Sequence, residues 1–235
     1  PNSKLAASVC APASAFDLLQ WQEQAQAHTA LWRSESSLPK PRRIEVADDT
    51  MPADTAFRHI SEGASLLWRG DFQNARQLLL ALGRRLDKKS RRKSPAKSPA
   101  AAGFPHAFHL YRQSQAQRAR MLASILIELD LQWHCALRRA PDWSLACSEA
   151  WGAVSAEAHA QSVLVPLRDL LGVVGAHEWR KKGVEIPALD GARIHAHYGV
   201  FSPVRGEYLD LVARASIPAA GLVQAWDIGV GTGVL

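Results

Sequence analysis

The chain has 235 residues, of which 47% are hydrophobic and 21% are charged, a composition close to that of ordinary globular proteins. This length accommodates one large domain or two small ones and supports a sizeable core, which excludes a wholly disordered chain. Uncharged stretches such as Leu5 to Phe16 and Ala215 to Trp226 have 12 residues each. A membrane-spanning helix needs roughly 18 to 20 apolar residues, so we expect no membrane attachment.

The cysteines and the first residues bear on the cellular compartment. The sequence opens without the apolar block of a signal peptide. Cys10, Cys135 and Cys147 show neither CxxC spacing nor a paired pattern, which argues against a disulfide framework or a zinc ribbon. We therefore expect a protein of the reducing cytoplasm.

The net charge of +6 is concentrated in one segment. Between Arg84 and Lys97, eight basic residues accompany one acid, Asp87, so this segment carries +7 and the rest of the chain −1. Two uses remain open: a solvated linker, or an arm that contacts RNA phosphates. No aromatic residue lies within the segment, so base stacking has no support there.

Residues 1–56, rich in Ala, Ser, Gln and Pro, predict a loosely ordered lead-in with one helix near Phe16–Trp32. Residues 57–183 predict a helical accessory region, because apolar residues recur at helical spacing. Lys88–Gly103 lacks any apolar period and predicts a mobile basic linker. The helices expected in the accessory region cover Phe57–Trp68, Phe72–Asp87 after the N-cap Asp71, Gln113–Glu128, Trp143–Trp151, and Pro166–Lys182 before Gly183.

From Val184 the pattern changes to one typical of β-structure. Val184–Leu189 and Ala192–Phe201 flank Asp190-Gly191, a dipeptide that favours a hairpin turn. A helix over Pro203–Ala215 and a short apolar strand over Leu222–Ile228 are expected to follow.

That strand leads into the most informative segment, in which Asp227 precedes glycines at every second position. A phosphate-binding P-loop is excluded because no Gly-Lys-Ser/Thr ending is present. A GxGxxG/A dinucleotide fingerprint counted from Gly229 needs Gly or Ala at position 234, where Val234 stands. The remaining pattern, Asp227-x-Gly229-x-Gly231-x-Gly233, resembles motif I of class I S-adenosylmethionine-dependent methyltransferases.

The resemblance implies roles for six residues that bind the cofactor. Asp227 would lie close to the methionine part of S-adenosylmethionine, and Gly229, Gly231 and Gly233 would let the backbone pass against it. The stretch from His197 to Leu209 is similar to the segment that precedes motif I in small-domain methyltransferases. There Phe201 would line the pocket and Arg205 would reach the cofactor carboxylate. Alternatively, Arg205 forms a solvated pair with Glu207.

The expected fold is accordingly an α+β fragment. A mostly helical N-terminal region would precede a β-hairpin and the first strand of a Rossmann-like methyltransferase sheet, and the methyltransferase domain would begin at residue 184 and be truncated at 235. The chain starts with Pro1 rather than Met, which also favours a fragment. The helical region resembles the accessory part of bacterial methyltransferases of this kind.

The expected function is methyl transfer to an RNA base or a protein side-chain amide by the parent protein. The fragment itself would be inactive, with its catalytic residues unknown and the oligomeric state not indicated. One alternative is a non-enzymatic helical module that binds nucleic acid, in which the glycine loop is vestigial. A nicotinamide-dependent oxidoreductase is disfavoured by Val234.

Two further groups of side chains point to structural roles. His195 and His197 alternate on an expected strand, and strand polar positions explain them better than a metal site does. Cys135 next to His134 is better explained as a buried or idle thiol than as a nucleophile. We expect no metal.

Overall fold

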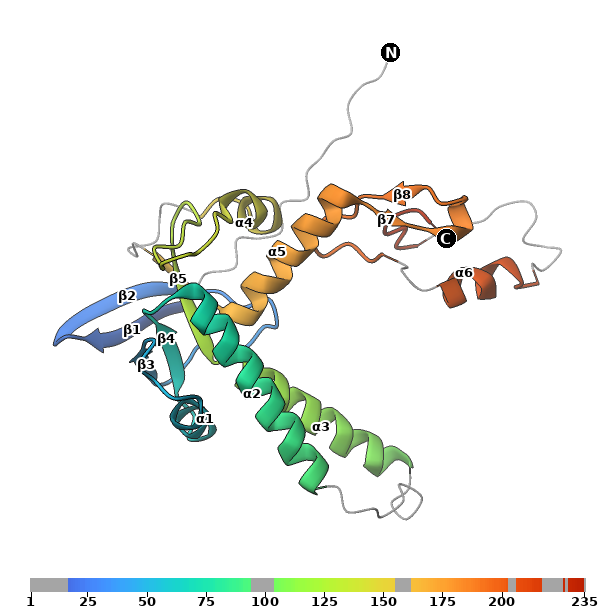
Figure 1. Cartoon of the computed structure of the whole chain (residues 1–235). Helices are drawn as coiled ribbons and strands as arrows, with labels where there is room; N and C mark the ends of the chain where they lie inside the picture. Colours follow the sequence, from blue (N-terminus) through green and yellow to red (C-terminus); the bar gives the residue numbers. More distant parts are fainter. Residues whose placement is uncertain are drawn as a thin grey trace.

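The computed structural model describes residues 17–93, 104–154, 162–202, 206–216, 226 and 228–234, with the backbone alone at 89–93 and 104 (Figure 1). Its main element is a six-stranded sheet in the order β1-β2-β6-β5-β4-β3. The strands are β1 (Asp17–Glu23), β2 (Gln26–Trp32), β3 (Ile44–Ala47), β4 (Ser65–Trp68), β5 (Ile125–Asp130) and β6 (Ser162–Pro166).

The sheet is mixed. β3, β4 and β5 run parallel, β6 is antiparallel to β5, and the antiparallel hairpin β1–β2 joins β6 through a parallel pairing with β2. Parallel neighbours need a crossover connection, and α1 and the pair α2–α3 provide the two crossovers. The helices are α1 (Ala53–Ser61), α2 (Phe72–Lys93), α3 (Phe104–Leu122), α4 (Ser144–Trp151), α5 (Leu167–Lys182) and α6 (Gly206–Ala213).

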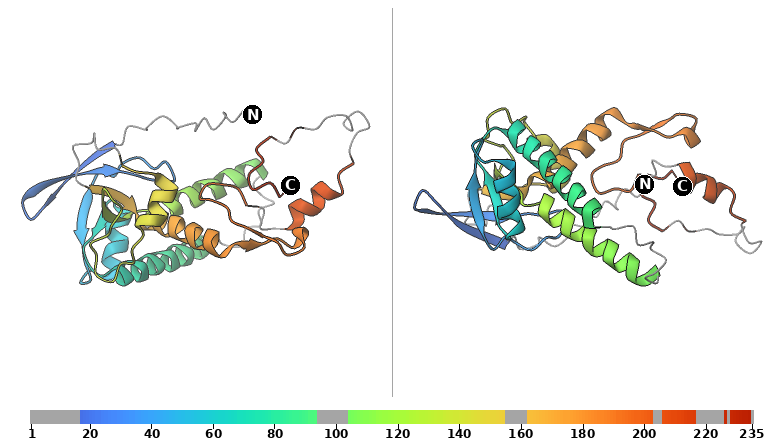
Figure 2. Two further views of the ribbon diagram at one scale, coloured as in Figure 1. Left: turned by 90° about the horizontal axis from the view of Figure 1, so that it is seen from above. Right: turned by 60° about the horizontal axis from the view of Figure 1, so that its bottom comes forward.

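The helices differ in how they relate to the sheet. α2 and α3 extend together away from it, and α5 leads from it to the C-terminal segment, which lies apart from the six-stranded sheet (Figures 1 and 2). That segment holds a two-stranded sheet of β7 (Val184–Glu185) and β8 (Arg193–Ile194), a short 3₁₀-helix at Pro187–Leu189, and α6. No helix in the described part of the chain is both long and apolar enough to cross a bilayer.

The central strands are buried on both faces. Leu66 and Trp68 pack with the helices in the larger core cluster, whereas Leu67 between them belongs to a second cluster. The second cluster contains Leu19 and Trp21, so the sheet curls until its own β1–β2 hairpin covers that face. This explains why the central strands are continuous apolar runs rather than alternating ones.

The expectation of a mostly helical N-terminal region is wrong. Where a helix was expected near Phe16–Trp32, the described residues form the β1–β2 hairpin. Leu19 and Trp21 are buried while their neighbours in β1 are exposed, which is strand periodicity. The turn places Gln24 and Ala25 at φ 50° and 63°, the left-handed conformation of a tight hairpin turn, without the Asn-Gly pair that usually marks it.

Two other expected helices are each a helix followed by a strand. α1 ends at Ser61 and β4 begins at Ser65, whereas α3 ends at Leu122 and β5 begins at Ile125. A short apolar run buried on both faces has no alternation, so its sequence cannot be distinguished from a buried helix. The predicted fragment, with only the first strand of a Rossmann-like sheet, is therefore contradicted: residues 17–166 contain a six-stranded sheet of their own.

Other predictions are confirmed. α2 begins directly after its N-cap Asp71, α4 and α5 cover the predicted ranges, and Gly183 ends α5 at φ 72°. The hairpin around Asp190-Gly191 is present, although its pairing is limited to β7 and β8. The predicted helix after Pro203 is α6, which begins at Gly206.

Two predictions about irregular segments have mixed outcomes. The linker predicted from Lys88 is helical as far as Lys93, and residues 94–103 lie outside the described part. Of the strand predicted over Leu222–Ile228, the structure describes Trp226 and Ile228, and neither belongs to a strand. Nothing in the structure tests the division at residues 56 and 183, which stays a prediction.

Candidate functional site

The glycine segment and Phe201 lie against each other. Gly229, Gly231 and Gly233 have φ values of 85°, 57° and 70°, a left-handed backbone that L side chains rarely adopt. A Cβ at Gly231 would lie 3.2 Å from the carbonyl oxygen of Phe201, so a side chain there would displace its neighbour by a few tenths of an ångström. The structure thus places Gly231 against Phe201, whereas Asp227 and Arg205 lie outside the described residues, so the predicted cofactor site stays a prediction.

Two hydroxyl groups at the same place lack hydrogen-bond partners. Ser202 Oγ follows Phe201 directly and Thr232 Oγ1 follows Gly231, and both atoms are shielded from solvent without a partner in the described part of the chain. An unsatisfied buried hydroxyl costs about 1–3 kcal/mol. Gly233 N donates to Val230 O at 2.8 Å, which closes the glycine segment into a turn.

The strand predicted before the glycine segment is not found at the residues that the structure describes there. A cofactor loop of a doubly wound sheet follows the carboxyl end of a strand, whereas Trp226 and Ile228 are 80% and 94% exposed and belong to no strand. Exposed apolar side chains are concentrated in this part of the chain, at Val200, Phe201, Tyr208, Leu211, Val212, Trp226, Ile228 and Val230. The turn geometry therefore fits a cofactor loop, and a sheet behind it is not found among the described residues.

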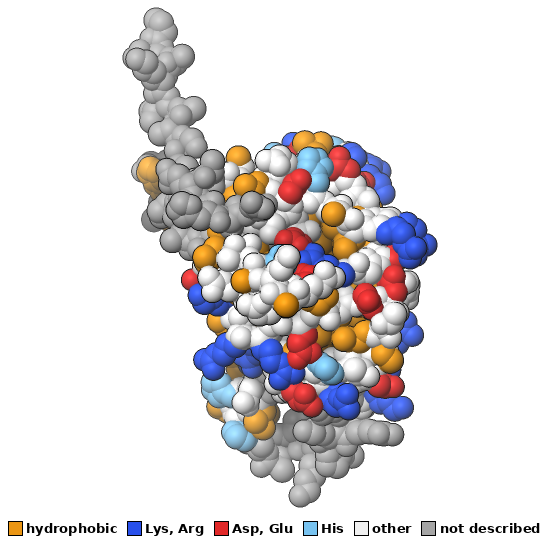
Figure 3. All heavy atoms as spheres, turned by 90° about the vertical axis from the view of Figure 1, so that its left-hand side faces the viewer, with side chains coloured by type: hydrophobic (Ala, Val, Ile, Leu, Met, Phe, Trp, Pro, Cys, Tyr) orange, Lys and Arg blue, Asp and Glu red, His pale blue; other side chains and the backbone are white. Residues whose placement is uncertain are grey.

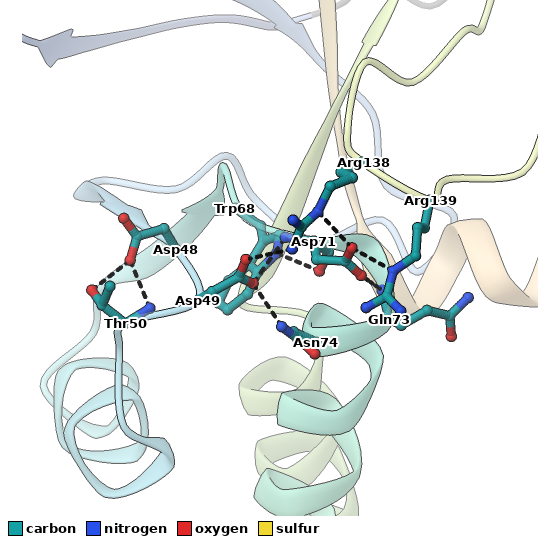
Figure 4. A network of polar contacts seen from close by, with 9 residues as sticks. All are labelled: Asp48, Asp49, Thr50, Trp68, Asp71, Gln73, Asn74, Arg138 and Arg139. Carbon is teal, nitrogen blue, oxygen red and sulfur yellow. Dashed lines mark hydrogen bonds and ion pairs between the residues drawn. The ribbon is translucent and has the colours of Figure 1, made fainter.

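A second cluster of polar groups lies where β3 and β4 end (Figure 4). β3 is followed by Asp48 and Asp49, and β4 by Arg69, Gly70 and Asp71. Asp49 Oδ1 accepts hydrogen bonds from the backbone N of Asp71 at 2.8 Å and from Asn74 Nδ2 at 3.0 Å. A Cβ at Gly70 would lie 2.7 Å from the backbone N of Asp49, so the two loops approach as closely as glycine allows.

Asp71 fastens the loop after β5 to this junction. Its side chain is buried; Oδ1 caps α2 by accepting from Gln73 N, and Oδ2 accepts from Nε of Arg138 at 3.0 Å and of Arg139 at 2.6 Å. The hydrogen bond from Arg139 is the main cause that lowers the pKa of Asp71 to about 2. A carboxylate with both oxygens engaged and so low a pKa is a poor proton acceptor, so this cluster is structural.

A hollow of about 300 Å³ lies beside the ends of β4 and β5. Arg69 crosses it, donating to Glu23 at 2.6 Å and 2.9 Å and to Glu128 at 2.5 Å, and Ser162 Oγ also donates to Glu128. The hydrogen bond from Arg69 is the main cause that lowers the pKa of Glu23. Glu23 and Glu128 share the single guanidinium of Arg69, so this group of three charged side chains keeps a net negative charge.

The cysteine and histidine side chains that the sequence singled out have structural surroundings. Burial raises the pKa of Cys135, which keeps it a thiol, and His134 Nδ1 lies 3.2 Å from Asp130 Oδ2. His195 Nδ1 donates to the carbonyl oxygen of Arg180 at 2.6 Å. Within the described ranges, no three His, Cys, Asp or Glu side chains are grouped as a metal site requires.

The contacts of Asp71 with Arg138 and Arg139 were not predicted from the sequence. A signal was nevertheless present: an apolar run at Ser65–Trp68 is followed by Gly70, Asp71 and a helix, the order found at the carboxyl end of a strand in α/β units.

Comparison with known proteins does not assign a family: no protein-family model, curated protein or solved structure matches the chain.

Proposed function

We propose that the chain binds S-adenosylmethionine at Phe201 and the Gly229-x-Gly231-x-Gly233 segment and serves methyl transfer. The observation that carries this proposal is the approach of Gly231 to the Phe201 carbonyl, with left-handed backbone at all three glycines. These two stretches are the ones that the resemblance to class I methyltransferases pairs, and they are distant in sequence. A glycine-rich turn without a binding role would not be expected to contact Phe201, which lies in the segment that precedes motif I in the resemblance.

The residues would divide the work as follows. The glycine backbone passes against the cofactor, and the hydroxyls of Ser202 and Thr232 supply hydrogen bonds that they do not make among the described residues. Asp227 would lie near the methionine part and Arg205 near the carboxylate, both on the resemblance alone. The bound cofactor supplies an activated methyl group, and the protein contributes alignment with the acceptor.

The proposal keeps both acceptor classes, an RNA base and a protein side-chain amide, because no described residue distinguishes them. It also keeps the cytoplasm as the compartment. Cys135 and Cys147 are free thiols, which supports a reducing environment.

The test is isothermal titration calorimetry of the chain with S-adenosylmethionine, for which we expect a micromolar dissociation constant. Gly231→Val should weaken binding at least tenfold, because the branched side chain would meet the Phe201 carbonyl. Gly152→Val is the matched control: Gly152 also has a positive φ, 74°, but lies in the loop after α4, with nothing within 4 Å of its Cβ position.

Two results would overturn the proposal. One is that the folded wild-type chain does not bind S-adenosylmethionine at about 100 μM, which is 100-fold above a dissociation constant of about 1 μM. The other is equal loss in the two glycine variants, which would trace the effect to backbone strain. Titration with NADH in parallel tests the disfavoured oxidoreductase alternative.

A further inference from the structure

The α2–α3 hairpin carries the positive charge of the molecule. From Arg84 to Arg120 the sequence has eleven lysines and arginines and one acid, Asp87, so this stretch carries +10 and the rest of the chain −4. The stretch begins in α2 and ends in α3, the two helices that extend away from the sheet (Figures 1 and 2). All of these cations except Lys97 belong to α2 and α3.

Few of these charges are compensated within the described structure. Asp87 pairs with Arg118 Nε at 3.0 Å, which joins the two helices, and Arg85 pairs with Asp54 of α1 at 2.8 Å. Four other cations are exposed and make no ion pair with any carboxylate of the described residues: Arg84, Lys88, Arg112 and Arg120. Uncompensated like charges on one element repel one another, and a polyanion removes that repulsion.

The first three turns of α3 are largely exposed. In the described residues 105–117, every side chain except Ala107 is exposed, including Phe108 at 48% and Tyr111 at 60%. The guanidinium of Arg112 lies over the Phe108 ring, 5.9 Å from its centroid. No aromatic residue occurs within the basic segment of the sequence, but α3 places two aromatic rings beside the basic helix α2. Aromatic rings next to cations are the usual platform for unpaired bases.

One face of the molecule shows a mixture of both signs of charge. On the face shown in Figure 3, basic and acidic side chains alternate over the surface, and no large region has one sign. The hairpin is thus distinguished by the sign of its charge, and its exposed rings Phe108 and Tyr111 lie next to that charge along the chain.

We propose that the α2–α3 hairpin binds single-stranded nucleic acid. Arg84, Lys88, Arg112 and Arg120 would contact backbone phosphates, and Tyr111 would stack on a base. A single strand fits better than a duplex, because a duplex hides the faces of its bases and would leave the rings unused. This inference does not depend on S-adenosylmethionine binding and stands or falls separately.

The test is fluorescence anisotropy of the whole chain with labelled 20-nucleotide single-stranded RNA and DNA and with the corresponding duplexes, from 50 to 300 mM salt. The variant replaces Arg84, Lys88, Arg112 and Arg120 by Gln. The matched control replaces four exposed arginines elsewhere that have no ion pair in the described structure, Arg42, Arg58, Arg168 and Arg214. Both proteins lose four positive charges.

Each lost phosphate contact lowers the slope of log K against log salt by about 0.7 for a single strand. We therefore expect the hairpin variant to flatten the slope by about 3 and to weaken binding about 100-fold at 150 mM salt, whereas the control changes little. Tyr111→Ala should weaken single-strand binding about tenfold with the slope unchanged, since stacking is not ionic.

The outcomes that overturn the proposal are specific. Equal weakening of hairpin variant and control would indicate a general charge effect. Preference for duplexes would exclude stacking on Tyr111. Binding to vesicles with anionic lipid but not to either nucleic acid would assign the hairpin to a membrane surface. Comparison of the affinities for single-stranded RNA and single-stranded DNA identifies which nucleic acid is the partner.

Discussion

Gly70→Ala tests the close packing at the ends of β3 and β4. The added methyl group would lie 2.7 Å from both the backbone N and Cγ of Asp49, where ordinary contacts begin near 3.4 Å, so the loop must move by about 0.7 Å. Overpacking of this kind costs about 1–3 kcal/mol. The movement also disturbs the hydrogen bonds that Asp49 accepts from Asp71 N and Asn74, each worth about 0.5–1.5 kcal/mol. We expect a loss of about 2–4 kcal/mol in the free energy of unfolding.

The assay is urea unfolding followed by tryptophan fluorescence and far-UV circular dichroism. With a slope near 3 kcal/mol/M, a loss of this size moves the midpoint down by about 1 M. Gly172→Ala is the matched control, because Gly172 lies inside α5 with nothing within 4 Å of its Cβ position. Alanine there should raise stability by about 0.5–1 kcal/mol. If Gly70→Ala also raises the midpoint, the close approach of the two loops is refuted.

Two further predictions concern other parts of the fold. Asp71→Asn should destabilise the protein at neutral pH. The pKa of Asp71 is lowered from 3.8 in the unfolded chain to about 2 in the folded protein, so its carboxylate stabilises the fold above pH 3.8 and loses this effect as the pH falls toward 2. The difference in stability between the variant and the wild type should therefore shrink as the pH falls from about 4 toward 2. Thermal unfolding across this range checks it, and a difference independent of pH would contradict the ion pairs with Arg138 and Arg139. Replacing Gln24-Ala25 by Asn-Gly should raise stability by about 1 kcal/mol, since both positions have positive φ that the new pair adopts at less cost; a lower urea midpoint would argue against that turn.

Local signals in the sequence predicted the elements that depend on local chemistry. Asp71 before a run of leucines at helical spacing identified α2, and Gly183 after three basic residues identified the end of α5. For β4 and β5 the sequence wrongly predicts parts of helices, because both strands are apolar on both faces and lack the alternation of a half-buried strand. Their burial depends on pairing with each other and on the β1–β2 hairpin, which are contacts between distant residues.

In the candidate site, too, features that depend on local sequence were predicted, and contacts between distant residues were not. The glycine spacing predicted which residues need an unusual backbone, and the structure shows Gly231 against Phe201. The clamp between Asp71 and Arg138 and Arg139 joins positions 67 and 68 residues apart, and no spacing rule connects them. The predicted strand before the glycines would require neighbouring strands to cover Trp226 and Ile228, and in the described residues these side chains remain exposed.

Hydrogen–deuterium exchange with and without S-adenosylmethionine tests the central claim most directly, because it reports binding and its place together. A cofactor held by the glycine segment should slow amide exchange in peptides covering residues 199–202 and 228–234, and leave α2 and α3 unchanged. Exchange that is identical with and without the cofactor in both peptides, or slowed only elsewhere in the chain, would contradict it.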